Sequence, residues 1–202
     1  MPDLPLPELE GTSLVLIGSF NPRIFQPSWF VRNGLLPESA EEANVEIITN
    51  EVCAFDADWF RLDVLSDRLS VASTATPSPE SLRDLLLGAL TILRHTPVAR
   101  LGLNTHSHHR LSSADAWHAF GHMIAPKTLL WDPILHEPGT RSLVIEGRRP
   151  DDNIGAVRVK VEPSQQFENS IFLETNDEYI SAEAVSAEWA IHILNTEWEN
   201  SR

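Results

Sequence analysis

Five of the eight histidines lie close together, between residues 106 and 122. His106 and His108 are two residues apart, so they point to the same face if this segment is a strand. His118 and His122 are four residues apart, so they share one face of a helix. Two such pairs supply four imidazole nitrogens, a donor set that suits zinc or another divalent transition metal. The spacing therefore predicts a metal site whose candidate ligands are His106, His108, His118 and His122.

The same histidines have a simpler interpretation. A zinc-protease helix carries a glutamate between its two histidines, and the five residues from His118 to His122 contain none. A general base would have to come from elsewhere, from Glu137 or Asp132. Without a metal, the helical pair lies on the solvent face and the strand pair lies at an exposed edge. A metal-dependent hydrolase is therefore the alternative function, with zinc as its alternative cofactor, and no cofactor is the leading expectation.

Aromatic side chains in the proline-rich segment 21–43 are a second candidate site. Trp29 and Phe30 are of the residue types that anchor protein interfaces. We expect them to be exposed in a loop and predict them as partner-binding residues. In the competing interpretation, this loop packs Phe20, Phe25 and the same two side chains onto the sheet.

A small basic patch is the third candidate. Arg158 and Lys160 share one face of a predicted strand and stand out on an acidic chain. We predict that they bind an anionic group or an acidic partner. In the competing interpretation, they lie on an exposed sheet face and are balanced across the strands by Glu146, Glu162 and Glu174.

The segment Gly18-Ser19-Phe20-Asn21-Pro22 follows an apolar strand. It resembles the entry segment of adenylyl- and nicotinamide-nucleotide transferases, in which a glycine-rich turn holds phosphates on backbone N–H groups. In that family two histidines follow, and here the chain continues from Arg23 without them. The resemblance implies a nucleotide-binding module as a third, weaker hypothesis.

Hydrophobic periodicity predicts the elements that position these residues. Strands are expected over 13–20, 44–55, 59–65, 68–74, 98–104, 142–148, 156–162 and 170–175. Helices are expected from Pro79, capped by Ser78, from Ser112, with Asp115 completing a capping box, and over about 182–199. Short connections between strands favour antiparallel pairing. The pattern predicts an α+β fold with a mainly antiparallel sheet of about six to eight strands and three helices. It forms a single domain over 13–202, after an extended tail over 1–12.

Composition narrows the function classes. The 202 residues carry a formal net charge of −14, which argues against nucleic acid or an anionic membrane as partner. The single cysteine, Cys53, excludes a disulfide framework and is expected to be a buried, inert thiol. With no signal peptide and no apolar run of about 18 residues, the expected location is the reducing cytoplasm.

No complete catalytic signature occurs in the sequence. The leading prediction is a non-enzymatic cytoplasmic protein that acts as an interaction, assembly or chaperone-like module. Its expected partner is another protein or a second copy of the chain.

Overall fold

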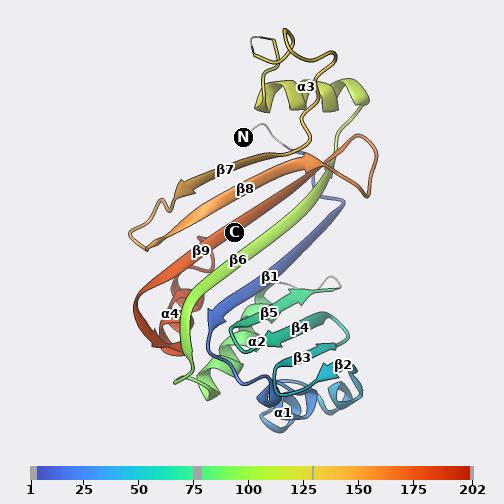
Figure 1. Cartoon of the computed structure of the whole chain (residues 1–202). Coiled ribbons are helices and arrows are strands. Elements are labelled where there is room, and N and C mark those ends of the chain that lie inside the picture. The colour runs from blue at the N-terminus through green and yellow to red at the C-terminus, as the bar shows by residue number, and fades with distance from the viewer. Residues whose placement is uncertain (1–3, 75–78, 129, 201–202) are drawn as a thin grey trace. The chain divides into compact units, whose positions relative to one another are not determined.

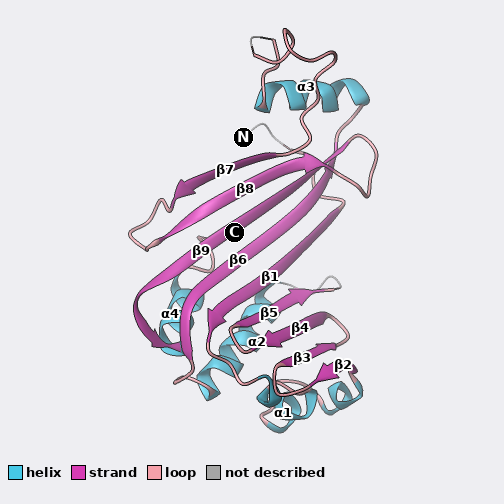
Figure 2. Ribbon diagram, in the orientation of Figure 1, coloured by secondary structure: helices cyan, strands magenta, loops and turns pink. Residues whose placement is uncertain are grey.

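The computed structural model describes residues 4–74, 79–128 and 130–200. Its elements follow in the order β1 (Leu9–Gly18), η1 (Pro22–Ile24), α1 (Pro27–Arg32), η2 (Glu38–Glu42), β2 (Asn44–Ile48), β3 (Val52–Asp56), β4 (Phe60–Leu65), β5 (Arg68–Ser73), α2 (Pro79–Ile92), β6 (Pro97–Arg110), α3 (Ala114–Ile124), β7 (Leu143–Arg148), β8 (Gly155–Pro163), β9 (Ser170–Ser186) and α4 (Ala187–Thr196). The predicted α+β class is confirmed, with helices and one nine-stranded antiparallel sheet (Figures 1 and 2). The strand order is β2-β3-β4-β5-β1-β6-β9-β8-β7.

Pairing of β1 with β5 shows how alternation sets the register. Leu14 lies opposite Val71 and Leu16 opposite Leu69, and all four side chains are buried. Ile17, one position on, is exposed. Because successive side chains point to opposite faces of a strand, a slip of one residue would expose this apolar set.

Strands β2 to β5 form consecutive antiparallel hairpins. The predicted hairpin around Ser66-Asp67 is confirmed. The single strand predicted over 44–55 is wrong, because β2 ends at Ile48 and β3 begins at Val52. The Thr49 hydroxyl accepts hydrogen bonds from the N–H groups of Glu51 and Val52 and thereby closes a turn between them.

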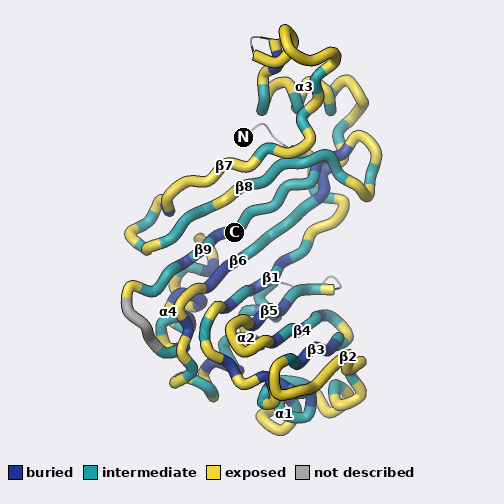
Figure 3. Tube along the Cα trace, viewed as in Figure 1, coloured by how far each residue is buried: buried dark blue, intermediate teal, exposed yellow. Residues whose placement is uncertain are grey.

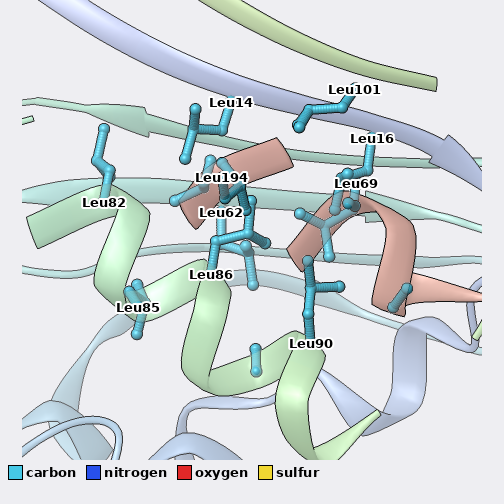
Figure 4. Packing of buried hydrophobic residues seen from close by; sticks show 14 of the residues in the cluster. Leu14, Leu16, Leu62, Leu69, Leu82, Leu85, Leu86, Leu90, Leu101 and Leu194 are labelled. Carbon is cyan, nitrogen blue, oxygen red and sulfur yellow. The ribbon is translucent and has the colours of Figure 1, made fainter. Parts of the chain in front are cut away.

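The helix predicted from Pro79 is α2, and one of its faces is apolar and buried. Its buried side chains are Leu82, Leu85, Leu86, Ala89 and Leu90. They join the buried face of α4 and the inward side chains of β1, β4 and β5 in one apolar cluster (Figure 4). Pro79 begins α2 as predicted, and Ser78 lies outside the described residues.

Cys53 belongs to the same cluster and is buried, as predicted. Its Sγ donates to the carbonyl oxygen of Phe25 at 3.1 Å. Burial raises the pKa of the thiol to about 11, and the nearby carboxylate of Asp63 adds to the effect. The thiolate, which is the reactive form, is therefore scarce at neutral pH.

The segment over 21–43, predicted to be irregular, contains α1 and two short 3-10 turns. Pro27 stands at the first turn of α1, where a missing N–H costs nothing. The helix turns Phe30 inward until only 2% of it is exposed, with its ring 6.0 Å from that of Phe55. The expectation that Phe30 is exposed is therefore wrong. Trp29 is half-buried against the same cluster, as the competing interpretation held.

Further boundaries differ from the prediction. β6 runs from Pro97 to Arg110, six residues beyond the predicted end at residue 104. β9 continues to Ser186, so the last helix begins at Ala187 rather than near residue 182. Sheet pairing overrides the helical preference of an alanine-rich segment here. β1 begins at Leu9, so the last residues of the predicted tail belong to a strand.

The chain divides into two compact units. Unit 1 comprises the described residues of Met1–Glu10, Thr105–Gly147 and Val157–Asn176, and unit 2 comprises those of Gly11–Asn104, Arg148–Ala156 and Asp177–Arg202. The apolar cluster of α2 and α4 lies entirely within unit 2. The division into compact units does not test the prediction of a single domain over 13–202, which therefore stays a prediction.

Candidate functional site

The strand histidines of the predicted metal set lie on β6 in unit 1. His106 and His108 both face Phe172, with ring centroids 6.1 and 5.0 Å from its ring. The Nδ1 of His109 instead lies 2.7 Å from the carbonyl oxygen of Pro5. The predicted alternation is thus confirmed. The imidazoles of the first pair pack on an aromatic side chain.

His108 also contacts a serine that the sequence did not single out. Its Nδ1 lies 2.9 Å from the hydroxyl of Ser164. The two residues are 56 positions apart in the chain, so no local sequence pattern predicts their contact. The Ser164 Oγ accepts hydrogen bonds from the N–H groups of Gln166 and Phe167 at 3.1 and 3.2 Å. These two bonds occupy both acceptor lone pairs, and the hydroxyl proton remains for the imidazole.

The Ser164 hydroxyl therefore closes a turn and joins it to His108. Burial lowers the pKa of His108, and the neighbouring His106 and His109 lower it further. The neutral imidazole, which accepts the serine proton, is accordingly favoured.

The helical histidines lie on α3, also in unit 1. The Ser113 Oγ accepts from the N–H of Ala116 at 3.1 Å, so the cap is Ser113 and the predicted Ser112 cap is wrong by one residue. Trp117 and Phe120 are half-buried, whereas His118 and His122 are exposed. The apolar side chains of α3 thus lie on its inner side, but no residue of α3 is fully buried (Figure 3).

A pocket of about 620 Å³ lies beside α3. It is lined by Trp117, His118, Phe120, Gly121, His122, Ile124, Lys127, Asp132, Leu135, His136, Glu137, Pro138, Gly139, Thr140, Val161, Glu162, Pro163 and Ile171. The pocket brings the helical histidines together with both carboxylates that were considered as a general base, Asp132 and Glu137.

The four predicted metal ligands do not converge. Neither His106 nor His108 lines this pocket. Within the part of the chain that the structure describes, no group of three or more His, Cys, Asp or Glu side chains is arranged to hold a metal ion. The sequence spacing identified two histidine pairs correctly, and the fold places them apart.

Lys127 organises the wall of the pocket. Its side chain is buried, and its Nζ donates to the carbonyl oxygens of Gly121, at 2.9 Å, and Ala125, and to the hydroxyl of Thr140. These three bonds use all three ammonium donors. The cation sits at the C-terminal end of α3, where the helix dipole favours positive charge. Lys127 thus joins the end of the helix to the far side of the loop.

The segment after Lys127 exposes a run of large apolar side chains. The N–H of Trp131 donates to the carbonyl of Lys127, and the N–H groups of Ile134 and Leu135 donate to that of Trp131. The exposed fractions are 67% for Leu130, 47% for Trp131, 74% for Ile134 and 50% for Leu135. We call these four side chains the apolar patch. The sequence signal was present, since four large apolar residues in six lie within a proline-containing loop.

The basic patch on β8 is paired within unit 1. Arg158 Nε lies 2.9 Å from a carboxylate oxygen of Glu146. Lys160 Nζ lies 2.7 Å from Glu174 and 3.6 Å from Glu162, and the bond to Glu174 raises the pKa of the lysine. This is the arrangement of the competing interpretation, in which cross-strand glutamates balance both cations.

In the segment Gly18–Pro22, backbone N–H groups donate hydrogen bonds to carbonyl groups of the protein itself. The N–H groups of Gly18, Ser19 and Phe20 donate to the carbonyls of Asp67, Pro97 and Ser66. A Cβ at Gly18 would lie 2.1 Å from the carbonyl oxygen of Pro97, so close backbone approach accounts for the glycine. These three amides have no proton left for a phosphate, so the geometry gives the nucleotide hypothesis no support.

Comparison of the sequence with models of known protein families and with curated proteins gave no match. Among the described residues, no helix has the length and apolar character needed to cross a membrane.

Proposed function

We propose that the protein is a protein-interaction module and that the apolar patch of unit 1 binds its partner. One observation carries the proposal. The four side chains of Leu130, Trp131, Ile134 and Leu135 are 47–74% exposed, within six consecutive residues. Exposed apolar clusters on a folded surface are typical of interaction sites.

The distribution of burial supports the same conclusion. Among the described residues of unit 1, Ile171 is the one large apolar side chain in the buried core set, whereas unit 2 holds the whole apolar cluster. Met123, Val144 and Ile145 of unit 1 are also more than half exposed. Fully burying an exposed side chain of this kind contributes roughly 1.5–3 kcal/mol, and burying the exposed half of one contributes about half as much. A partner that covers the apolar patch therefore gains several kcal/mol from these side chains.

The partner-binding residues expected from the sequence support the proposal less well. Phe30 is part of the core of unit 2 and Trp29 packs against that core. Arg158 and Lys160 already pair with glutamates. Trp131 supplies the aromatic anchor that Trp29 was expected to be. The observations favour no second candidate function.

The test is a comparison of two double variants as affinity baits. Trp131→Ala/Ile134→Ser removes half of the apolar patch. Ile92→Ser/Ile154→Ser removes two exposed isoleucines of unit 2 and serves as the matched control. We expect the free energy of unfolding of both variants to lie within about 1 kcal/mol of that of the parent, because all four positions are exposed.

Proteins captured by the parent chain and by the control, but lost from the patch variant, support the proposal. If the partner is a second copy of the chain, analytical sedimentation at several concentrations should show self-association of the parent and the control that the patch variant has lost. Identical capture and identical sedimentation of all three chains contradict the proposal.

A further inference from the structure

The pocket beside α3 has an apolar floor. Trp117, Phe120 and Ile124 project from the helix, and Val161 and Ile171 come from β8 and β9. Its volume of about 620 Å³ falls in the range of roughly 300–1,000 Å³ in which proteins enclose ligand groups. A pocket of this size accommodates a few side chains of a partner segment.

The charged groups of the pocket are mostly carboxylates. Asp132, Glu137 and Glu162 line it, and Lys127 is the one formal cation among the described lining residues. The ammonium of Lys127 is buried and already donates three hydrogen bonds, so it offers no donor to an occupant. Arg141 follows Thr140 in the chain but does not line the pocket.

The three carboxylates differ in how far they are neutralised. Glu162 lies 3.6 Å from Lys160, although that lysine is closer to Glu174. In the part of the chain that the structure describes, neither Asp132 nor Glu137 pairs with a lysine or arginine, and the imidazole of His136 lies 3.9 Å from Glu137. The Glu137 side chain is 86% exposed. Among the described residues, an occupant therefore meets two carboxylates that no lysine or arginine neutralises.

The pocket and the apolar patch are continuous. Leu135 belongs to both, and Asp132 lies between the patch residues Trp131 and Ile134 in the chain while also lining the pocket. A segment bound here contacts apolar side chains and carboxylates together. An acidic segment is repelled, because it brings like charges to Asp132 and Glu137.

We infer that the partner presents a basic amphipathic segment, with apolar side chains on the patch and the α3 floor and a lysine or arginine at Asp132 and Glu137. This inference rests on the proposed function and specifies the chemistry of its partner. Charge complementarity selects among segments that the apolar surface alone would accept equally.

The test uses two labelled 18-residue amphipathic peptides that share the same leucine positions. In one peptide the polar positions are lysine, and in the other they are glutamate. Binding to the full chain is measured by fluorescence anisotropy in low and in physiological salt. We expect the leucine–lysine peptide to bind at least about tenfold more tightly than the leucine–glutamate peptide.

A net charge of −14 attracts any cationic peptide, so the charge control is essential. Asp132→Asn/Glu137→Gln removes two carboxylates at the pocket. Glu38→Gln/Glu41→Gln removes two exposed carboxylates of η2 in unit 2 and changes the net charge equally. We expect the pocket variant to bind the lysine peptide about five- to tenfold more weakly and the control to bind it almost as the parent does. Equal weakening in both variants overturns the inference.

The readout separates this inference from the proposed function. If both peptides bind equally and Trp131→Ala/Ile134→Ser weakens both, the apolar patch binds protein segments and the charge inference fails. If neither peptide binds and that variant captures the same proteins as the parent, the proposed function fails and the inference fails with it. Thermal melts of each variant verify that the chain remains folded.

Discussion

Arg149 is the most deeply buried cation among the described residues of unit 2. Its side chain is 3% exposed, and its guanidinium lies 3.5 Å from the ring centroid of Tyr179. Two of its nitrogens hold the carboxylate of Asp151, and a third donates to Asp177, whose side chain is 6% exposed. The hydrogen bonds from Arg149 lower the pKa of Asp151 to about 2. The guanidinium therefore fastens the turn after β7 to β9.

Replacing Asp177 by Asn tests this assignment. The substitution keeps the size of the side chain and removes its charge, which leaves a buried guanidinium without one of its two carboxylates. We expect a loss of about 3–5 kcal/mol in the free energy of unfolding, measured by urea denaturation.

The matched control is Asp152→Asn, one residue beyond Asp151 at an exposed position. We expect this change to cost less than about 0.5 kcal/mol. Equal effects from the two substitutions contradict a specific role for the buried pair.

At the scale of elements, α3 differs from the other long helices. α2 and α4 each bury a face in the apolar cluster, whereas the stripe of α3 is only half-buried. Most of the stability of a protein helix comes from packing of its apolar face. The cap at Ser113 and the cation at Lys127 therefore matter more for α3 than caps do for α2.

We expect Lys127→Met to destabilise α3. The methionine fills similar space but leaves the carbonyls of Gly121 and Ala125 and the hydroxyl of Thr140 without their donor. The cost should be about 1–3 kcal/mol, from the lost hydrogen bonds and the lost interaction with the helix dipole. Circular dichroism during thermal unfolding measures it.

The chain has one other lysine, Lys160, which supplies the control. It pairs at a half-exposed site on β8, where such ion pairs contribute about 0–1 kcal/mol. Lys160→Met should therefore change the melting temperature much less. The reverse order of the two effects contradicts the role assigned to Lys127.

At the scale of the whole molecule, apolar burial is unevenly distributed. Unit 2 buries the side chains of α2, α4 and the inward faces of its strands in one cluster. The buried polar residues of unit 1 include His108, His109 and Lys127, and its described large apolar side chains other than Ile171 are half-buried or exposed. Local stability follows buried apolar contact.

Hydrogen exchange followed by mass spectrometry should show this difference. We expect amides of α3 and of the segment 130–140 to exchange faster than those of α2 and α4, because less apolar burial opposes their opening. The leucine–lysine peptide should slow exchange in the first group and leave α2 unchanged. Equal protection of α2 and α3 in the free chain contradicts the expected difference in stability.

The sequence by itself determined the features that depend on neighbours in the chain. Hydrophobic periodicity marked the helix from Pro79, and its helical spacing puts Leu82, Leu86 and Ala89 on the buried face of α2. Alternation identified most strands, and the spacing of the two histidine pairs placed each pair on one face. Composition also indicated one buried thiol and an acidic surface. The helix and strand patterns follow from local backbone geometry, which the order of residues sets directly, and the acidic character follows from composition alone.

Only the tertiary structure decided which apolar segments are covered. Trp29 and Trp131 both lie in proline-containing segments, yet the first packs on the core of unit 2 and the second is exposed. Sheet pairing likewise extended β9 to Ser186 against helical preference, and it placed His108 beside Ser164. Burial and pairing depend on residues far apart in the chain, whose contacts form only when the whole sheet assembles. For that reason the pocket beside α3 and the apolar patch became visible in the fold rather than in the sequence.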